Sequence, residues 1–139
     1  MTILILIYLR LGLSEEEEEV WLLVRVIRDP EHPFTLSQLR VVSPSLVKYE
    51  RAVNTFVVQF KPTIPNCSLS SIIGLSIRER ISCNYVLDPP FKLVVRVADR
   101  SHDDYELINK QLLDKERIAA ALEKSEVARI IRNCIQDPY

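Results

Sequence analysis

The first apolar stripe in the chain predicts a helix. Val20, Leu23, Val24 and Ile27 recur at helical spacing directly after the acidic run 15–19. Acidic residues in a first turn suit the positive end of the helix dipole. The residue before a proline is disfavoured in helical backbone, so Asp29-Pro30 is expected to end this helix.

Short β-like runs follow a loop predicted for residues 30–38. Residues 39–42 and 46–49 are apolar-rich and are separated by Pro44. Thr55–Phe60 alternates apolar and polar residues, as a strand with one buried face does. The short polar stretch before it predicts a hairpin.

Helical spacing dominates the second half of the chain. From about Asn66, apolar residues recur every four positions up to Ile81, and Asp88-Pro89-Pro90 ends that pattern. Residues 91–97 alternate as a third strand, so a strand–helix–strand unit with a right-handed parallel crossover is expected. Helical segments are then predicted at 103–113, 114–122 and 127–135, with Asp114 and Ser125 as N-caps.

These elements predict a single compact α/β (α+β) domain over residues 15–139. Its small mixed sheet of about three strands would be covered by helices, in the order α-β-β-α-β-α-α, with two or three helices at the end. Residues 1–14 are a separate apolar segment. They are too short to span a bilayer and lack the flanks of a secretory signal. A strand or docking segment is the leading interpretation; a targeting signal and a variable end stay open.

Composition narrows the classes of partner. A chain of 139 residues suits one domain, and its net charge of −1 provides no bulk attraction for nucleic acid. Protein partners are therefore expected. Three widely spaced cysteines make a poor disulfide framework and suit a reducing compartment. Only two glycines are present, and no phosphate-cradling glycine loop is found.

Cys67 is the main candidate for chemistry. It lies where a predicted strand is followed by a predicted helix, in the run KPTIPNCS. A helix N-terminus favours thiolate, the form that attacks electrophiles and binds metals. A small buried residue in a packed turn is the alternative. Cys134 lies on the apolar stripe of the last helix and is expected in the core, and Cys83 is also interpreted as structural.

The two histidines are secondary candidates. His32 and His102 each lie beside acidic residues in a predicted loop. Either could complete a metal site or orient a thiol, but such residues are more often turn formers and solvated charges. A pair of Cys67 with a histidine requires the fold to bring them together.

Three longer motifs together resemble a known family. They are IRDPEHP at 27–33 (with TL at 35–36 and VV at 41–42), FKPTIPNCSL at 60–69 (continuing to IGL at 73–75), and INKQL with DKERIAAALE at 108–123. These stretches resemble the eukaryotic Cia2-type proteins of the cytosolic iron–sulfur assembly targeting complex, which are related to bacterial SufT and PaaD. The resemblance runs from about residue 20 to 137.

The resemblance implies residue roles. The reactive cysteine of the family falls on Cys67, with Thr63 and Asn66 beside it in the motif. The family histidine before the Asn-Lys-Gln helix falls on His102, and the Asp-Pro-Glu element falls on Asp29 and Glu31. The family usually has a histidine immediately before the cysteine, where this chain has Asn66.

It also implies a non-enzymatic adaptor that is located in the cytoplasm, with the nucleus left open as a second location. Family members bridge a WD40 propeller protein and a HEAT-repeat adaptor and serve iron–sulfur client apo-proteins; a homodimer stays open, and no nucleic acid or membrane partner is implied. No tightly bound cofactor is expected. Because one cysteine cannot hold a four-thiolate cluster, a transient cluster, zinc or iron would be shared with a partner. A thiol-dependent redox or transfer enzyme, and a metal carrier using Cys67 and His102, are the alternatives.

Overall fold

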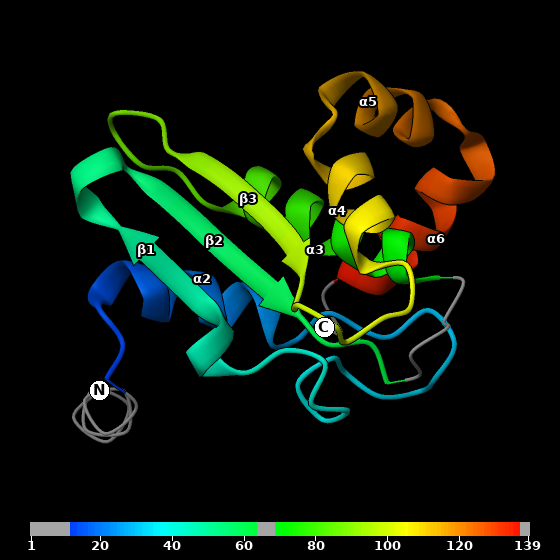
Figure 1. The fold of residues 1–139 in the computed structure, drawn as a ribbon, viewed down its shortest axis with the longest axis horizontal. Coiled ribbons are helices and arrows are strands. Elements are labelled where there is room, and N and C mark those ends of the chain that lie inside the picture. The colour runs from blue at the N-terminus through cyan, green and yellow to red at the C-terminus, as the bar shows by residue number, and fades with distance from the viewer. Residues whose placement is uncertain (1–11, 64–68, 137–139) are drawn as a thin grey trace.

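A three-stranded mixed sheet forms the centre of the protein. The computed structural model describes residues 12–63 and 69–136. Strand β1 (Val47–Glu50) pairs antiparallel with β2 (Thr55–Phe60), and β3 (Lys92–Val97) pairs parallel with β2 on its other side. The strand order is β1-β2-β3 (Figure 1). The predicted hairpin, parallel crossover and α/β class are confirmed.

Helices cover one face of this sheet and extend beyond its β3 edge. Helices α2 (Glu15–Val24) and α3 (Ser70–Asn84) lie behind the sheet in Figure 1. The chain then continues through α4 (Tyr105–Leu113), α5 (Lys115–Glu123) and α6 (Ser125–Ile135). Helix α4 packs beside β3, and α6 returns to pack against α3.

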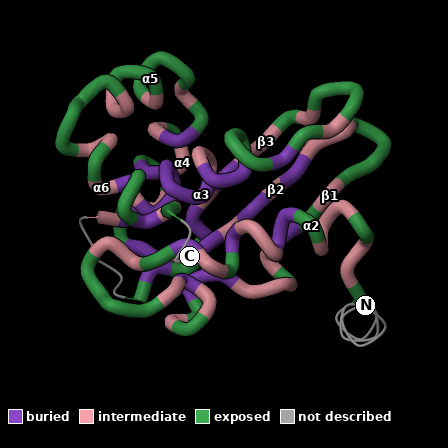
Figure 2. The backbone as a smooth tube through the Cα atoms, turned by 180° about the vertical axis from the view of Figure 1, so that it is seen from behind, coloured by how far each residue is buried: buried purple, intermediate pink, exposed green. Residues whose placement is uncertain are grey.

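The core lies between the sheet and its two covering helices, as the buried stretches of β2, β3 and α3 show (Figure 2). Phe56, Val58 and Phe60 of β2 are fully buried, and the residues between them are half-buried. This burial follows the alternation in the sequence. At one end of the core Phe56 packs against other aromatic rings: its centroid lies 4.4 Å from that of Tyr49 in a tilted contact and 5.3 Å from that of Phe91 in an edge-to-face contact.

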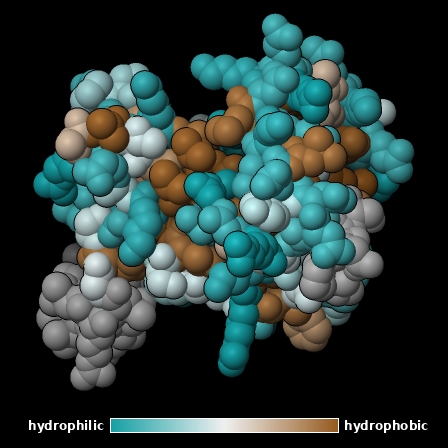
Figure 3. Space-filling view, viewed as in Figure 1, coloured by the Kyte–Doolittle hydropathy of each residue, from teal (hydrophilic) through white to brown (hydrophobic). Residues whose placement is uncertain are grey.

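The opposite face of the sheet is open to solvent. Val57 and Val94 are half-buried there, and charged residues at neighbouring positions surround them. Figure 3 shows an apolar area bordered by hydrophilic side chains on this side of the molecule.

The first helix begins as its sequence suggests and ends earlier than predicted. The Ser14 hydroxyl accepts from the Glu17 N–H at 3.2 Å, while the Glu17 carboxylate accepts from the Ser14 N–H at 2.9 Å. This capping box fixes the start. The helix ends at Val24, not at Asp29-Pro30. Ile27 continues the apolar spacing and is fully buried, but it lies in the chain that leaves the helix.

Two other predictions of local structure were wrong. Residues 39–42 form turns instead of a β-like run, because Arg40 has left-handed backbone (φ 58°) and the Val41 N–H bonds back to the Leu36 carbonyl at 2.9 Å. Ser125 is the first residue of α6 and makes no capping bond. Asp114 is confirmed as the N-cap of α5, accepting from two backbone N–H groups.

Side chains occupy both edges of the sheet. At the β1 edge, the Glu17 carboxylate accepts from the Tyr49 N–H at 2.9 Å. At the β3 edge, the Asn109 side chain accepts from the Val97 N–H at 2.7 Å and donates to the Val97 carbonyl at 3.3 Å. Arg78 donates to the Leu93 carbonyl on the same edge at 2.9 Å. These backbone groups, which a further strand could use, are thus already bonded.

A glycine allows α3 and α4 to approach closely. A Cβ atom at Gly74 would lie 2.6 Å from the Leu112 Cδ1 and 2.9 Å from its Cδ2. Leu112 is 1% exposed, so its side chain would have to shift within the packed interior, toward the cavity of about 280 Å³ that it also lines. Gly74 and Leu112 belong to two of the three sequence motifs, and this contact gives both residues a packing role.

Candidate functional site

The segments that leave the two parallel strands begin next to each other. The Ala98 N–H, after β3, donates to the carbonyl of Phe60 at the end of β2, at 2.9 Å. In open α/β sheets ligands bind outside the carboxyl ends of the strands. The chain after β2 leads to Thr63, which is exposed, and then to Cys67; the chain after β3 leads to His102. Cys67 and Asn66 lie outside the described residues, so their geometry stays a prediction.

His102 is a buried residue in a tight turn. It is 6% exposed, and its Nδ1 accepts from the Asp104 N–H at 2.9 Å. A neutral imidazole that accepts at Nδ1 carries its proton on Nε2. The preceding Ser101 donates its hydroxyl to the Ala98 carbonyl at 2.6 Å, which fixes the turn to the end of β3. These two hydrogen bonds thus hold His102 in one orientation.

The Asp-Pro-Glu element forms a turn that is fastened to α6. Asp29 Oδ1 accepts from the N–H groups of Glu31 at 2.7 Å and His32 at 3.0 Å, an Asx-type arrangement. The Arg28 N–H donates to the carbonyl of Cys134 at 2.9 Å. The Asp29 carboxylate therefore stabilises the turn, and Glu31 and His32 are exposed at its surface.

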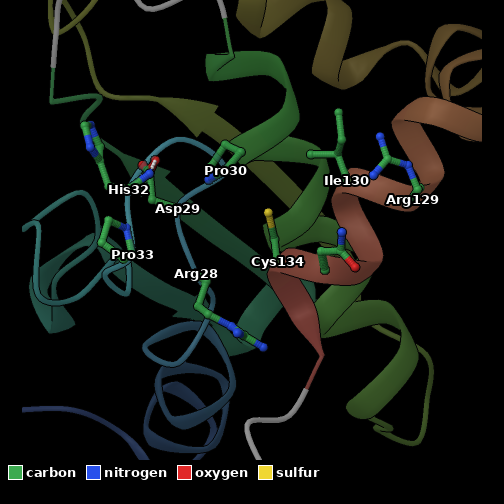
Figure 4. A pocket seen from close by; sticks show the side chains of 9 residues that line it. Arg28, Asp29, Pro30, His32, Pro33, Arg129, Ile130 and Cys134 are labelled. Atoms are coloured by element: carbon green, nitrogen blue, oxygen red, sulfur yellow. Dashed lines mark hydrogen bonds between the residues drawn. The ribbon is translucent and has the colours of Figure 1, made fainter.

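The turn and α6 enclose a cavity of about 400 Å³. Figure 4 shows Cys134 between the turn and the helix, with Arg129 and Ile130 along the helix side. Asp29 and His32 line this cavity, and His102 does not. The structure thus separates the two histidines, placing His32 on the turn side of the cavity that Cys134 also lines and His102 after the end of β3.

The two described cysteines differ in their surroundings. Cys134 is 3% exposed, and burial raises the pKa of its thiol, so the prediction of a core residue is confirmed. Cys83 is exposed, which contradicts its interpretation as a structural residue; the helix turns it away from the core. Partial burial, and then the Glu79 carboxylate 3.8 Å from its sulfur, raise the pKa of Cys83. Within residues 12–63 and 69–136 no three His, Cys, Asp or Glu side chains are grouped to hold a metal.

The sequence did not single out Arg80, which joins two helix ends. It is 8% exposed and lies between Ile77 and Ile81 on the buried side of α3. Its Nε donates to the Leu23 carbonyl and its Nη1 to the Ile135 carbonyl, each at 3.2 Å. Cations are stabilised at helix C-termini, and these carbonyls belong to the ends of α2 and α6. No local signal marks it, because both partners are more than 50 residues away.

Comparisons with known proteins address the resemblance directly. No protein-family profile matches the chain. The MIP18 family protein galla-2 of Drosophila melanogaster is 43% identical over 120 residues, covering 86% of this chain and 76% of that protein. Protein AE7-like 1 of Arabidopsis thaliana is 44% identical over 117 residues, 84% of this chain and 75% of that protein. The mouse protein named cytosolic iron-sulfur assembly component 2B is 39% identical over 122 residues, covering 88% of this chain and 74% of that protein.

Among the helices that the structure describes, none has the length and apolar character needed to cross a bilayer. The identities extend over most of this chain and about three quarters of each relative, far beyond a shared motif. The chain belongs to the MIP18 family, the Cia2-type proteins that its three motifs resemble.

Proposed function

We propose that this protein is a non-enzymatic adaptor in cytosolic iron–sulfur cluster assembly, acting in the cytosol and also in the nucleus. Family membership supports the general role, since relatives in mouse and Dictyostelium discoideum are named cytosolic iron-sulfur assembly component 2B. Its partners would be a WD40 propeller protein, a HEAT-repeat adaptor and iron–sulfur client apo-proteins, with neither nucleic acid nor membrane as a ligand. Self-association into a homodimer is compatible with this role.

The observation that carries the site assignment is the arrangement of the two loops after β2 and β3. The hydrogen bond between Ala98 and Phe60 joins the starts of these loops. One loop contains Cys67 in the chain, and the other holds His102 in a fixed, buried turn. We propose that Cys67 makes transient contact with a cluster, with zinc or iron, or with a client. Thr63, Asn66, His102 and the Asp29–Glu31 turn would support it.

One substitution separates assembly from transfer. Cys67→Ala should leave the protein bound to the propeller and HEAT-repeat partners in cell extracts, while iron incorporation into client proteins falls. Cys83→Ala is the matched control, because its thiol is exposed near the end of α3 and lies outside the Cys67 motif. If Cys67→Ala leaves both readouts intact, the assignment of Cys67 fails. If the unsubstituted protein captures neither partner, the adaptor role fails.

A thiol enzyme makes a different prediction. It requires a Cys67 thiol with a clearly depressed pKa and turnover of a small substrate. The rate of Cys67 alkylation against pH, measured in a Cys83→Ala background, should instead show an ordinary thiol near about 8.5. Elemental analysis of the purified protein with Cys67 and His102 replaced in turn tests the metal-carrier alternative.

A further inference from the structure

Two adjoining cavities lie along the outer side of α6. The first, of about 400 Å³, lies between α6 and the turn at 28–33. The second, of about 470 Å³, continues along the helix toward Gln136. Arg129 and Asn133 line both, so the two form one groove, which we call the α6 groove. Its volume lies within the range of ordinary ligand sites.

The α6 groove is strongly basic although the whole chain has a net charge of −1. Arg28, Arg129 and Arg132 line it and are exposed. Among residues 12–63 and 69–136, Asp29 is the one carboxylate that lines it, and one oxygen of that group already accepts two backbone N–H bonds. Among the residues that the structure describes, the three arginines have no carboxylate partner; the guanidinium of Arg28 donates to the Gln136 carbonyl, at 3.3 Å. By contrast, Arg51, Arg96 and Arg117 elsewhere on the surface each form an ion pair.

Apolar groups form the remaining wall of the first cavity. Pro30, Pro33, Ile130 and Cys134 line it, and Figure 4 shows the Cys134 sulfur between Pro30 and Ile130. The arginines lie on different sides of this apolar wall: Arg28 points toward the end of α6, and Arg129 lies beside Ile130. A ligand that fills the groove would therefore combine carboxylates with apolar side chains.

Hydrogen bonds also fix the walls of the groove relative to each other. The bond from the Arg28 N–H to the Cys134 carbonyl fixes the distance between the turn and α6. Arg80 holds the Ile135 carbonyl at the end of the same helix. A site with fixed walls loses less conformational freedom on binding than a mobile one does.

We propose that the α6 groove docks an acidic segment of a partner protein. Arginine pairs with carboxylates through strong, directional hydrogen bonds, and three arginines without carboxylate partners provide such contacts. The apolar wall and the small extent of the basic area favour a peptide over nucleic acid, which requires a longer basic stripe. This inference is independent of the proposed function.

The test uses the full chain and two synthetic peptides. The probe is a fluorescein-labelled, C-terminally amidated Glu-Asp-Leu-Glu-Asp-Leu-Glu-Asp peptide, and its control carries glutamine and asparagine in place of the acids. Fluorescence anisotropy should show binding of the acidic peptide, at least about tenfold weaker binding of the control, and loss of affinity with added salt. Amide chemical-shift changes should be confined to 28–36 and 126–136. Equal affinity of the two peptides, or shifts elsewhere, overturns the proposal.

Charge reversal then assigns the binding to named residues. Arg129→Glu and Arg132→Glu should each weaken binding by about tenfold or more, because each removes an attraction and adds a repulsion. Lys48→Glu is the matched control, since Lys48 is an exposed cation on β1 that lines neither cavity. A loss of affinity for Lys48→Glu as large as for Arg129→Glu would show non-specific attraction and refute the groove. Tighter binding of a single-stranded RNA octamer than of the acidic peptide would also refute it.

Discussion

The contact between Gly74 and Leu112 supports a quantitative test of how α3 and α4 pack. In a helix interior, replacing glycine by alanine gains about 0.8–1.0 kcal/mol of helix propensity. The new methyl group would lie 2.6 Å from the Leu112 Cδ1, inside van der Waals contact. Overpacking a well-filled core costs about 1–3 kcal/mol. Gly74→Ala is therefore expected to lower the free energy of unfolding by up to about 2 kcal/mol, although it improves the helix.

In the background of a second substitution, Gly74→Ala should raise the free energy of unfolding instead of lowering it. Leu112→Ala alone costs about 2–5 kcal/mol, because it removes a buried side chain and leaves a cavity. In that background the methyl group of Gly74→Ala meets open space, so the same change should stabilise the protein by about 1 kcal/mol. The coupling energy of the double-mutant cycle should then be about 1–3 kcal/mol.

These free energies of unfolding can be measured by urea denaturation, monitored through the fluorescence of Trp21. Trp21 is the only tryptophan and is 7% exposed, so unfolding changes its surroundings. Leu113→Ala provides the control, because Leu113 is 58% exposed and should not couple to position 74. If Gly74→Ala stabilises the unaltered protein, or if the cycle with Leu112 is additive within about 0.5 kcal/mol, the close approach of the two helices is refuted.

Four further substitutions test individual contacts. Ser14→Ala removes the N-cap of α2 and should cost about 1 kcal/mol in urea unfolding, and an unchanged midpoint would contradict the capping box. Asn109→Ala leaves Val97 backbone groups without their partner; it should cost about 1–3 kcal/mol and speed hydrogen exchange at the Val97 amide, whereas unchanged exchange would count against the contact. Arg80→Met keeps the stem but removes the bonds to two helix ends, so a loss of about 1.5–3 kcal/mol is expected, and no loss would contradict this role. Glu79→Gln should lower the raised pKa of Cys83 and speed its alkylation at pH 8, although burial, the larger cause, remains; a slower reaction would refute the stated sign.

Local patterns in the sequence predicted most elements because they depend on neighbouring residues. The alternation at Thr55–Phe60 and the spacing around Ile73, Ile77 and Ile81 correspond to the observed strand and helix. The same reasoning failed at 39–42. There the two valines are buried because a turn at Arg40 folds them inward, and a β-like composition cannot distinguish this from a strand.

The candidate site depended on contacts that no local pattern encodes. The sequence identified His102 as a loop histidine, but its burial arises from packing at the end of β3. The α6 groove joins Arg28 to Arg129, about a hundred positions apart, and each alone resembles an ordinary solvated charge. The prediction that Cys83 is structural was wrong for a related reason. Which side of α3 is buried near its end depends on the elements packed against it, and the local sequence does not show these.

The occupied edges of the sheet limit how this protein can grow into a larger assembly. Glu17 at one edge and Asn109 at the other already bond to backbone that a partner's strand would need. Adding a strand would first require removing these side chains, which protects the monomer from open-ended stacking in a crowded cell. Any complex that contains this protein is therefore expected to form through its helices, loops and open sheet face.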